Sequence, residues 1–179
     1  MIPLPGDRGR TPAAMIRVDH AGEYGAKRIY AGQLAVMRRR GDKATVALVE
    51  HMQSQEQHHL DTFARMIWER RVRPTALLPF WHVAGWVLGA ATAALGTRAA
   101  MACTVAVEEA IDAHYAGQAA ALPEAEASLR DTIEEFRAEE LEHRDTGLDH
   151  GAEQAVGYPV LRAAIGAGCR VAIALSEVI

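Results

Sequence analysis

Cysteine, clustered basic residues and strand-like patterns are scarce in this chain, and each scarcity excludes a class of protein. The 179 residues include only two cysteines, Cys103 and Cys169, which lie far apart and outside any CxxC spacing. A disulfide scaffold and a zinc ribbon are therefore not indicated, and a reducing compartment fits best. Because the formal net charge is -4 and the arginines are scattered, we expect no nucleic acid partner.

A leader and a strand pattern are missing as well. Residues 1–11 carry prolines and arginines where a secretory signal would have an apolar core, so we expect an N-terminal tail on a protein that is not exported. Runs of β-branched residues and period-two alternation are nearly absent, whereas Ala, Leu, Glu, Arg and Met fill the long segments. These residues favour helices, and the sequence therefore predicts an all-α fold.

Proline and glycine breaks divide the rest of the chain into six expected helices. Their approximate ranges are 12–39, 43–71, 78–95, 98–121, 125–150 and 159–176. Half of the residues are hydrophobic, which is enough to build the core of a single domain over 12–179. We expect the four longest helices to form a four-helix bundle of two hairpins, with an extra apolar helix between the hairpins and a further helix at the C-terminus.

An internal repeat supports the two hairpins. Glu23 precedes the sequence YAGQ, and 85 positions later Glu108 precedes YAGQ again. A Glu-x-x-His pair that begins at Glu56 returns 84 positions later at Glu140. Segments 12–71 and 98–150 therefore each predict one helix that carries a Glu, followed by one that carries Glu-x-x-His.

The repeated residues predict a metal site. Residues three apart lie on one face of a helix, so the Glu and the His of each pair can address one ion. A single such pair is usually a solvated helix face, but the ordered set at intervals of 33 and 32 residues is not readily explained by chance. Four carboxylates buried together need cations to offset desolvation and repulsion, and this thiolate-free set suits iron or manganese. The expected ligands are Glu23, Glu56, His59, Glu108, Glu140 and His143.

Other polar residues are expected near this site. Gln55 and Glu139 precede two of the glutamates and are candidates to accept the remaining imidazole protons across the bundle. His114 and Tyr115 follow Glu108 by one to two helical turns, so we expect them to line the cavity and to orient a substrate or exchange electrons with it. Ordinary packing is the alternative for both.

One segment raises the question of a membrane. Residues 77–95 form 19 consecutive positions without Asp, Glu, Lys or Arg, which is nearly the length of a spanning helix. Pro79, His82 and an Ala- and Gly-rich second half argue against spanning. Docking at the membrane interface and burial in an ordinary helix contact are the other two readings.

Five segments together resemble a known family. They are DHAGEYGAKRIYAGQLA, RVRPTALLPFWHVAGWVLGAATAALG, MACTVAVEEAIDAHY, FRAEELEHRDTGLDHGAE and AGCRVAIALSE, and they resemble the demethoxyubiquinone hydroxylases, which are ferritin-like di-iron carboxylate proteins. The resemblance covers the chain from Met15 to the C-terminus and shows no departure at the six expected ligands. It implies a di-iron monooxygenase that uses O2 to hydroxylate the ring of a 6-methoxy-3-methyl-2-polyprenyl-1,4-benzoquinol (demethoxyubiquinol) in ubiquinone biosynthesis.

The resemblance also implies cofactors and a location. Two iron ions per chain would fill the site, and NADH would be the ultimate electron donor, although the chain has no strand-linked GxGxxG motif for a dinucleotide. The quinol is dissolved in lipid, so segment 77–95 would face the membrane, with Trp81 and Trp86 at the headgroup level. We expect a peripheral protein on the cytoplasmic side of an inner or cytoplasmic membrane. A homo-oligomer and a quinone-biosynthesis protein partner are left open.

Two other functions fit part of this pattern. A ferritin-type protein that oxidises and stores iron uses the same six ligands, but the apolar segment is hard to place on a cage-forming subunit. A non-catalytic helical scaffold of a quinone-synthesis assembly would keep the metal site for a structural role only. A radical-generating reductase subunit or a manganese catalase shares the ligand pattern and leaves the apolar segment unexplained.

Overall fold

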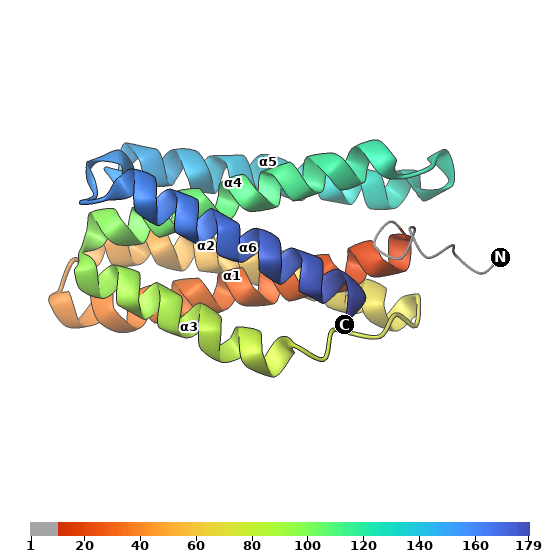
Figure 1. Cartoon of the computed structure of the whole chain (residues 1–179), viewed down its shortest axis with the longest axis horizontal. Coiled ribbons are helices and arrows are strands. Elements are labelled where there is room, and N and C mark those ends of the chain that lie inside the picture. The colour runs from red at the N-terminus through yellow and green to blue at the C-terminus, as the bar shows by residue number, and fades with distance from the viewer. Residues whose placement is uncertain (1–10) are drawn as a thin grey trace.

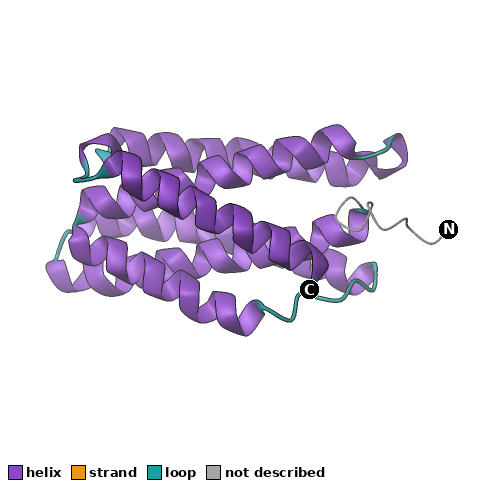
Figure 2. Cartoon of the chain, viewed as in Figure 1, coloured by secondary structure: helices purple, strands orange, loops and turns teal. Residues whose placement is uncertain are grey.

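The computed structural model describes residues 11–179, which form helices and connecting turns without a strand (Figure 1 and Figure 2). The expected all-α fold is therefore confirmed over this range. The long helices are α1 (Pro12–Arg40), α2 (Lys43–Glu69), α3 (Leu78–Leu95), α4 (Thr97–Ala121), α5 (Ala127–Asp149) and α6 (Tyr158–Val178). Two short 3-10 turns, η1 (Glu124–Glu126) and η2 (Ala152–Gln154), precede α5 and α6.

Local signals set the helix ends close to the expected positions. Thr11 caps α1 by accepting a hydrogen bond from a backbone N–H of the first turn, and Gly41 ends that helix in the left-handed conformation at φ 78°. Asp42 then caps α2 through the backbone N–H of Thr45 at 3.1 Å. No helix end deviates by more than two residues, and α2 ends at Glu69 instead of 71 because Arg71 has φ 53°. Residues 1–10 of the expected tail lie outside the described range, and the single domain over 12–179 stays a prediction.

The helices form two hairpins with two further helices laid against them. α1 packs on α2, and α4 packs on α5. In Figure 1, α6 crosses in front of the bundle, where it contacts both α4 and α1, while α3 runs beside α1. The extra apolar helix between the hairpins and the C-terminal helix are thus both present, and together they cover the α1 and α4 side of the bundle.

α1 and α3 approach each other at the level of their backbones. A Cβ atom added at Gly89 would lie 2.7 Å from the carbonyl carbon of Ile29, and one added at Gly32 would lie 2.7 Å from the backbone nitrogen of Ala90. These distances are well inside ordinary non-bonded contact. Only glycine at these two positions lets the helices pack this closely.

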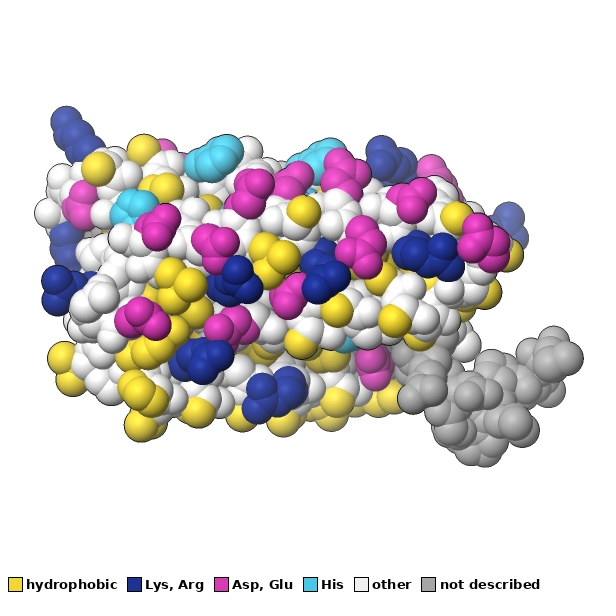
Figure 3. Space-filling view, turned by 90° about the horizontal axis from the view of Figure 1, so that it is seen from above, with side chains coloured by type: hydrophobic (Ala, Val, Ile, Leu, Met, Phe, Trp, Pro, Cys, Tyr) yellow, Lys and Arg dark blue, Asp and Glu magenta, His cyan; other side chains and the backbone are white. Residues whose placement is uncertain are grey.

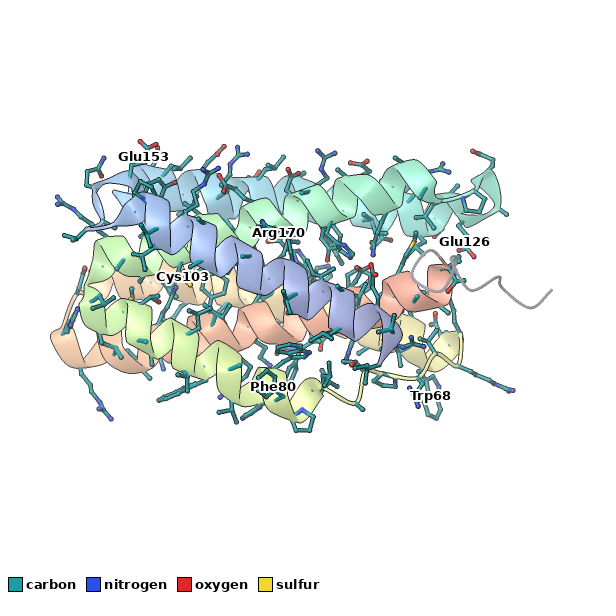
Figure 4. The ribbon with its side chains drawn as sticks, viewed as in Figure 1. Trp68, Phe80, Cys103, Glu126, Glu153 and Arg170 are labelled. Carbon is teal, nitrogen blue, oxygen red and sulfur yellow. The ribbon has the colours of Figure 1, made fainter. Side chains whose placement is uncertain are left out.

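The outer surfaces of α3 and α6 are apolar. Both helices are long and apolar enough to cross a membrane by length and composition alone, and most of each helix is not buried. Figure 4 shows Phe80 of α3 directed away from the bundle, and Val87 on the same helix and Val171 on α6 are also exposed. Figure 3 views a different side, on which acidic and basic side chains are interspersed and hydrophobic ones gather toward one edge. The apolar surface is therefore concentrated on α3 and α6.

Candidate metal centre

The structure brings the six expected ligands together inside the four-helix bundle. They form two groups that share Glu56 and Glu140, and within each group one ligand atom from every residue lies within 4.8 Å of the others. The first group adds Glu23 and His59, and the second adds Glu108 and His143. Each of these two groups could hold a metal ion.

Unsatisfied oxygen atoms show that this cluster fits cations. The six side chains are at most 2% exposed. One carboxylate oxygen of Glu23, one of Glu108 and both of Glu56 have no hydrogen-bond partner, and an imidazole nitrogen lies 3.3 Å from one oxygen of Glu23 and from one of Glu56. A buried oxygen without a partner costs about 1–3 kcal/mol, and more when it is charged. Divalent cations that accept these oxygens as ligands would remove that cost, and the oxygen and nitrogen donor set suits iron or manganese.

The electrostatics of the metal-free cluster lead to the same conclusion. Burial raises the pKa of the Glu56 and Glu108 carboxyls well above the usual value, and neighbouring carboxylates raise it further. Burial would lower the pKa of His59, but its hydrogen bonds to carboxylates outweigh this effect and raise it to about 12. Burial would raise the pKa of Glu140, but hydrogen bonds from the two imidazoles outweigh it and lower the value to about 2. Without metal the cluster therefore holds protons where two cations would otherwise sit.

The outer nitrogens of the two histidines meet the expected acceptors. Nε2 of His59 lies 3.1 Å from a carboxylate oxygen of Glu139, and Nε2 of His143 lies 3.1 Å from the amide oxygen of Gln55. Gln55 also donates a hydrogen bond of 3.0 Å to Glu139. These contacts confirm the predicted partners and leave Nδ1 of each ring directed at the carboxylate cluster.

Two buried tyrosines bond the carboxylates of the opposite hairpin. Tyr30 on α1 donates a hydrogen bond of 2.6 Å to Glu108 on α4. Tyr115 on α4 donates one to Glu23 on α1. Tyr115, expected from the sequence, thus touches a candidate ligand directly, and Tyr30 holds the equivalent position in the other hairpin.

His114 lies in a separate polar group. Its Nε2 is 3.3 Å from Asp19 on α1 and 2.8 Å from the amide of Gln118, which also donates a hydrogen bond of 2.8 Å to Asp19. Asp19 is 2% exposed, and burial raises the pKa of its carboxyl to about 6. Sequence reasoning missed Asp19 because no motif marks it, although its position one turn before Glu23 on the same helix face was a usable signal.

An apolar cavity of about 510 Å³ lies between the bundle and the two covering helices. α1, α3, α4 and α6 all contribute to its wall, and Gly22 and Val107 in that wall are chain neighbours of Glu23 and Glu108. His114 and Tyr115 are not among its lining residues, and their expected role toward a substrate stays a prediction. Cavities of this size and lining suit an apolar ligand.

The fold and the site define a helical-bundle protein with a buried carboxylate and imidazole cluster that fits metal binding. The family model described as "Ubiquinone biosynthesis protein COQ7" matches residues 10–176, and the chain belongs to this family.

Relatives of known name agree with that family. The chain is 56% identical over 178 residues to a 3-demethoxyubiquinol 3-hydroxylase of Rhodospirillum rubrum, across 97% of the chain and 82% of the relative. It is 54% identical over 167 residues to the mitochondrial NADPH-dependent 3-demethoxyubiquinone 3-hydroxylase of Homo sapiens, across 91% of the chain and 76% of the relative. It is 43% identical over 178 residues to the mitochondrial 5-demethoxyubiquinone hydroxylase of Saccharomyces cerevisiae, across 91% and 76%.

Proposed function

We propose that this chain is an O2-dependent monooxygenase that adds a hydroxyl group to the ring of a demethoxyubiquinol in ubiquinone biosynthesis. The observation that carries the proposal is the buried six-residue cluster with its unpartnered carboxylate oxygens, in a chain 56% identical to a named 3-demethoxyubiquinol 3-hydroxylase. Glu23, Glu56, His59, Glu108, Glu140 and His143 would hold two iron ions. When bound, the iron pair supplies the redox chemistry that activates O2.

The chain's own residues hold, orient and shield this centre. The outer contacts of His59 and His143 to Glu139 and Gln55 fix both imidazole rings. Tyr115 fixes the carboxylate of Glu23, and Tyr30 fixes that of Glu108. These two glutamates are the ligands outside the Glu-x-x-His pairs. The near-complete burial of the cluster excludes bulk water from the site, which protects a reactive oxidant from side reactions.

The apolar cavity is the proposed entry for the quinol. Its wall includes residues of α3 and α6, the two helices that expose the apolar surface. A polyprenyl quinol can therefore pass from lipid toward the bundle between these helices without crossing water. The mean hydropathy and exposure of both helices support docking of this face on a membrane. The proposed location is peripheral, on the cytoplasmic side of an inner or cytoplasmic membrane.

The reaction needs two electrons from outside the chain. The human relative is named as NADPH-dependent, so a reduced nicotinamide nucleotide is the proposed ultimate donor, and that name favours NADPH over the NADH that the family resemblance implies. Of the expected catalytic pair, Tyr115 is proposed to position Glu23, since it donates a hydrogen bond to that carboxylate. His114 contacts Asp19, with 3.3 Å between its Nε2 and Oδ1 of that carboxylate.

Metal content followed by a single turnover tests the function. The purified chain is analysed for iron, reduced without oxygen, and mixed with O2 labelled with oxygen-18 and a short-tailed demethoxyubiquinol. Two irons per chain and one labelled hydroxyl on the ring are expected. Rapid oxidation of ferrous iron without a hydroxylated product would overturn the proposal in favour of iron handling, and product formation that persists in a Glu108→Ala variant would contradict the six-ligand site.

Vesicle sedimentation tests the docking surface. Phe80 and Val87 are 61% and 51% exposed on α3, so a double change to Ser should weaken binding to anionic phospholipid vesicles. Circular dichroism should show unchanged helix content, because neither side chain is in the core. Unaltered vesicle binding would contradict docking through α3.

A further inference from the structure

The internal repeat provides a control for each polar contact around the site. Tyr30 bonds Glu108, and 85 positions later Tyr115 bonds Glu23, so this interaction belongs to both hairpins. Contacts that appear in both halves support the function that both halves share, which is to hold the ligands of the metal cluster. A polar group that appears in only one half must have another role.

Asp19 and His114 form such a one-sided group. The positions related to them by the offset of 85 are Thr104 and Ile29, and Ile29 is an apolar residue of the cavity wall. The side-chain amide of Gln118 donates a hydrogen bond to Asp19, and the amide nitrogen of its repeat counterpart, Gln33, lies 3.5 Å from the hydroxyl oxygen of Thr104. The two halves therefore share this geometry. The second hairpin thus builds the same bundle without a carboxylate or an imidazole here. Neither the fold nor the metal cluster requires the pair.

The pair joins a partly exposed imidazole to a buried carboxylate. His114 is partly exposed, with 14% of its side-chain surface accessible, whereas Asp19 is buried. Oδ1 of Asp19 takes the contacts with His114 and Gln118, and Oδ2 has no hydrogen-bond partner. Asp19 and Glu23 lie one turn apart on the same face of α1, a separation of about 5–6 Å between Cβ atoms, which one water at Oδ2 can span.

We propose that His114 and Asp19 form a proton-entry relay that takes protons from solvent at His114 and delivers them, through Oδ2 of Asp19, to the Glu23 side of the metal centre. This inference rests on the proposed function. Hydroxylation of the ring consumes one O2, two electrons from the nicotinamide nucleotide and two protons, and it yields one ring hydroxyl and one water. A cluster closed to bulk water needs a defined route for these protons.

The charges around Asp19 are compatible with proton transfer near neutral pH. The titratable groups that face it are His114 and Tyr115 on α4 and Glu23 on its own helix. Burial raises the pKa of the Asp19 carboxyl to about 6, while His114 and Gln118 oppose that rise. A carboxyl with a pKa close to the working pH can both accept and release a proton efficiently.

Two variants and a matched control test the relay. Asp19→Asn keeps the shape and the acceptor oxygen for Gln118 but cannot carry a proton, and His114→Gln removes the solvent end. Thr104→Val alters the repeat-related position of Asp19 and should leave the rate unchanged. Single-turnover hydroxylation is measured in H2O and D2O across pH 5.5 to 9, after confirming equal iron content. Both relay variants should slow by roughly 10- to 100-fold, gain a solvent isotope effect and recover in part with added small weak acids.

A second readout does not depend on turnover. Infrared difference spectra of the purified protein should show a carboxyl that titrates near pH 6 in the wild type, disappears in Asp19→Asn and titrates at higher pH in His114→Gln. A wild-type isotope effect and pH profile in Asp19→Asn would overturn the relay. Loss of rate with loss of iron and no isotope effect would overturn it too, because that result is structural. A wild-type protein that makes no hydroxylated quinol would overturn the proposed function instead, and the infrared titration would still decide whether Asp19 and His114 share a proton.

Discussion

The close approach of α1 and α3 makes a quantitative prediction for Gly89→Ala. The added Cβ would lie 2.7 Å from the carbonyl carbon of Ile29, whereas non-bonded carbon atoms stay roughly 3.5–4.0 Å apart. The opposing atoms belong to the backbone, so no rotation of a side chain relieves the clash, and α3 must move away from α1 by about 1 Å. Overpacking of this kind costs about 1–3 kcal/mol. In a chain of this length each kcal/mol lowers the Tm by roughly 2–4 °C.

Gly117→Ala is the matched control for this change. Gly117 lies inside α4 and no atom outside the local helix is within 4 Å of its ideal Cβ position. The same exchange there adds only helix propensity, about 1 kcal/mol in favour of folding, so its Tm should rise. Thermal unfolding of both variants under identical conditions compares their Tm values. Because Leu88 beside Gly89 lines the cavity, Gly89→Ala should also weaken binding of the quinol. Equal stability of the two variants would refute the backbone contact.

The centre itself supports three more predictions. Glu56→Gln removes a ligand shared by both metal groups, so bound iron should fall well below one ion per chain, which metal analysis of the folded variant would measure. The pKa values of Glu56 and Glu108 are raised in the metal-free fold, so the free energy of unfolding should fall as pH rises above about 4.3, the value of a Glu carboxyl in the unfolded chain. Denaturant titrations at several pH values would measure this trend, and iron loading should reverse it. A metal-free protein that gains stability above neutral pH would contradict the prediction. Tyr30→Phe and Tyr115→Phe each remove one hydrogen bond to a ligand, so comparable small losses of iron affinity are expected, and a large loss from only one of them would argue against equivalent roles.

The sequence predicts much of this architecture because its signals are local or repeated. The six helices follow from proline, glycine and capping residues such as Thr11 and Asp42, which act within a few positions. The ligand set follows from two nearly equal offsets along the chain, which report a duplication whatever the final packing. The partners of the outer imidazole nitrogens, Gln55 and Glu139, could be predicted for the same reason, since each precedes a repeated glutamate.

The features that escaped prediction depend on contacts between distant helices. Asp19 carries no motif, and its burial results from packing against His114 and Gln118 about 95 positions away. The apolar surface of α6 was missed because Arg170 and Glu177 interrupt the hydrophobic residues, whereas the expected segment 77–95 has no charge at all. The apolar cavity exists only where α3 and α6 cover the bundle, so its wall could not be read from either helix alone.

The hydrogen bonds around the cluster also constrain how such a protein could originate. Four of these bonds join one half of the chain to the other: Tyr30 reaches Glu108, Tyr115 reaches Glu23, and both imidazoles find their outer partners across the bundle. One hairpin alone would carry one Glu and one Glu-x-x-His with none of these partners. A half-length ancestor could therefore have built the centre only by pairing with a second copy of itself, and the fusion of two genes would have made that homodimer permanent and let the two halves diverge at positions such as Asp19.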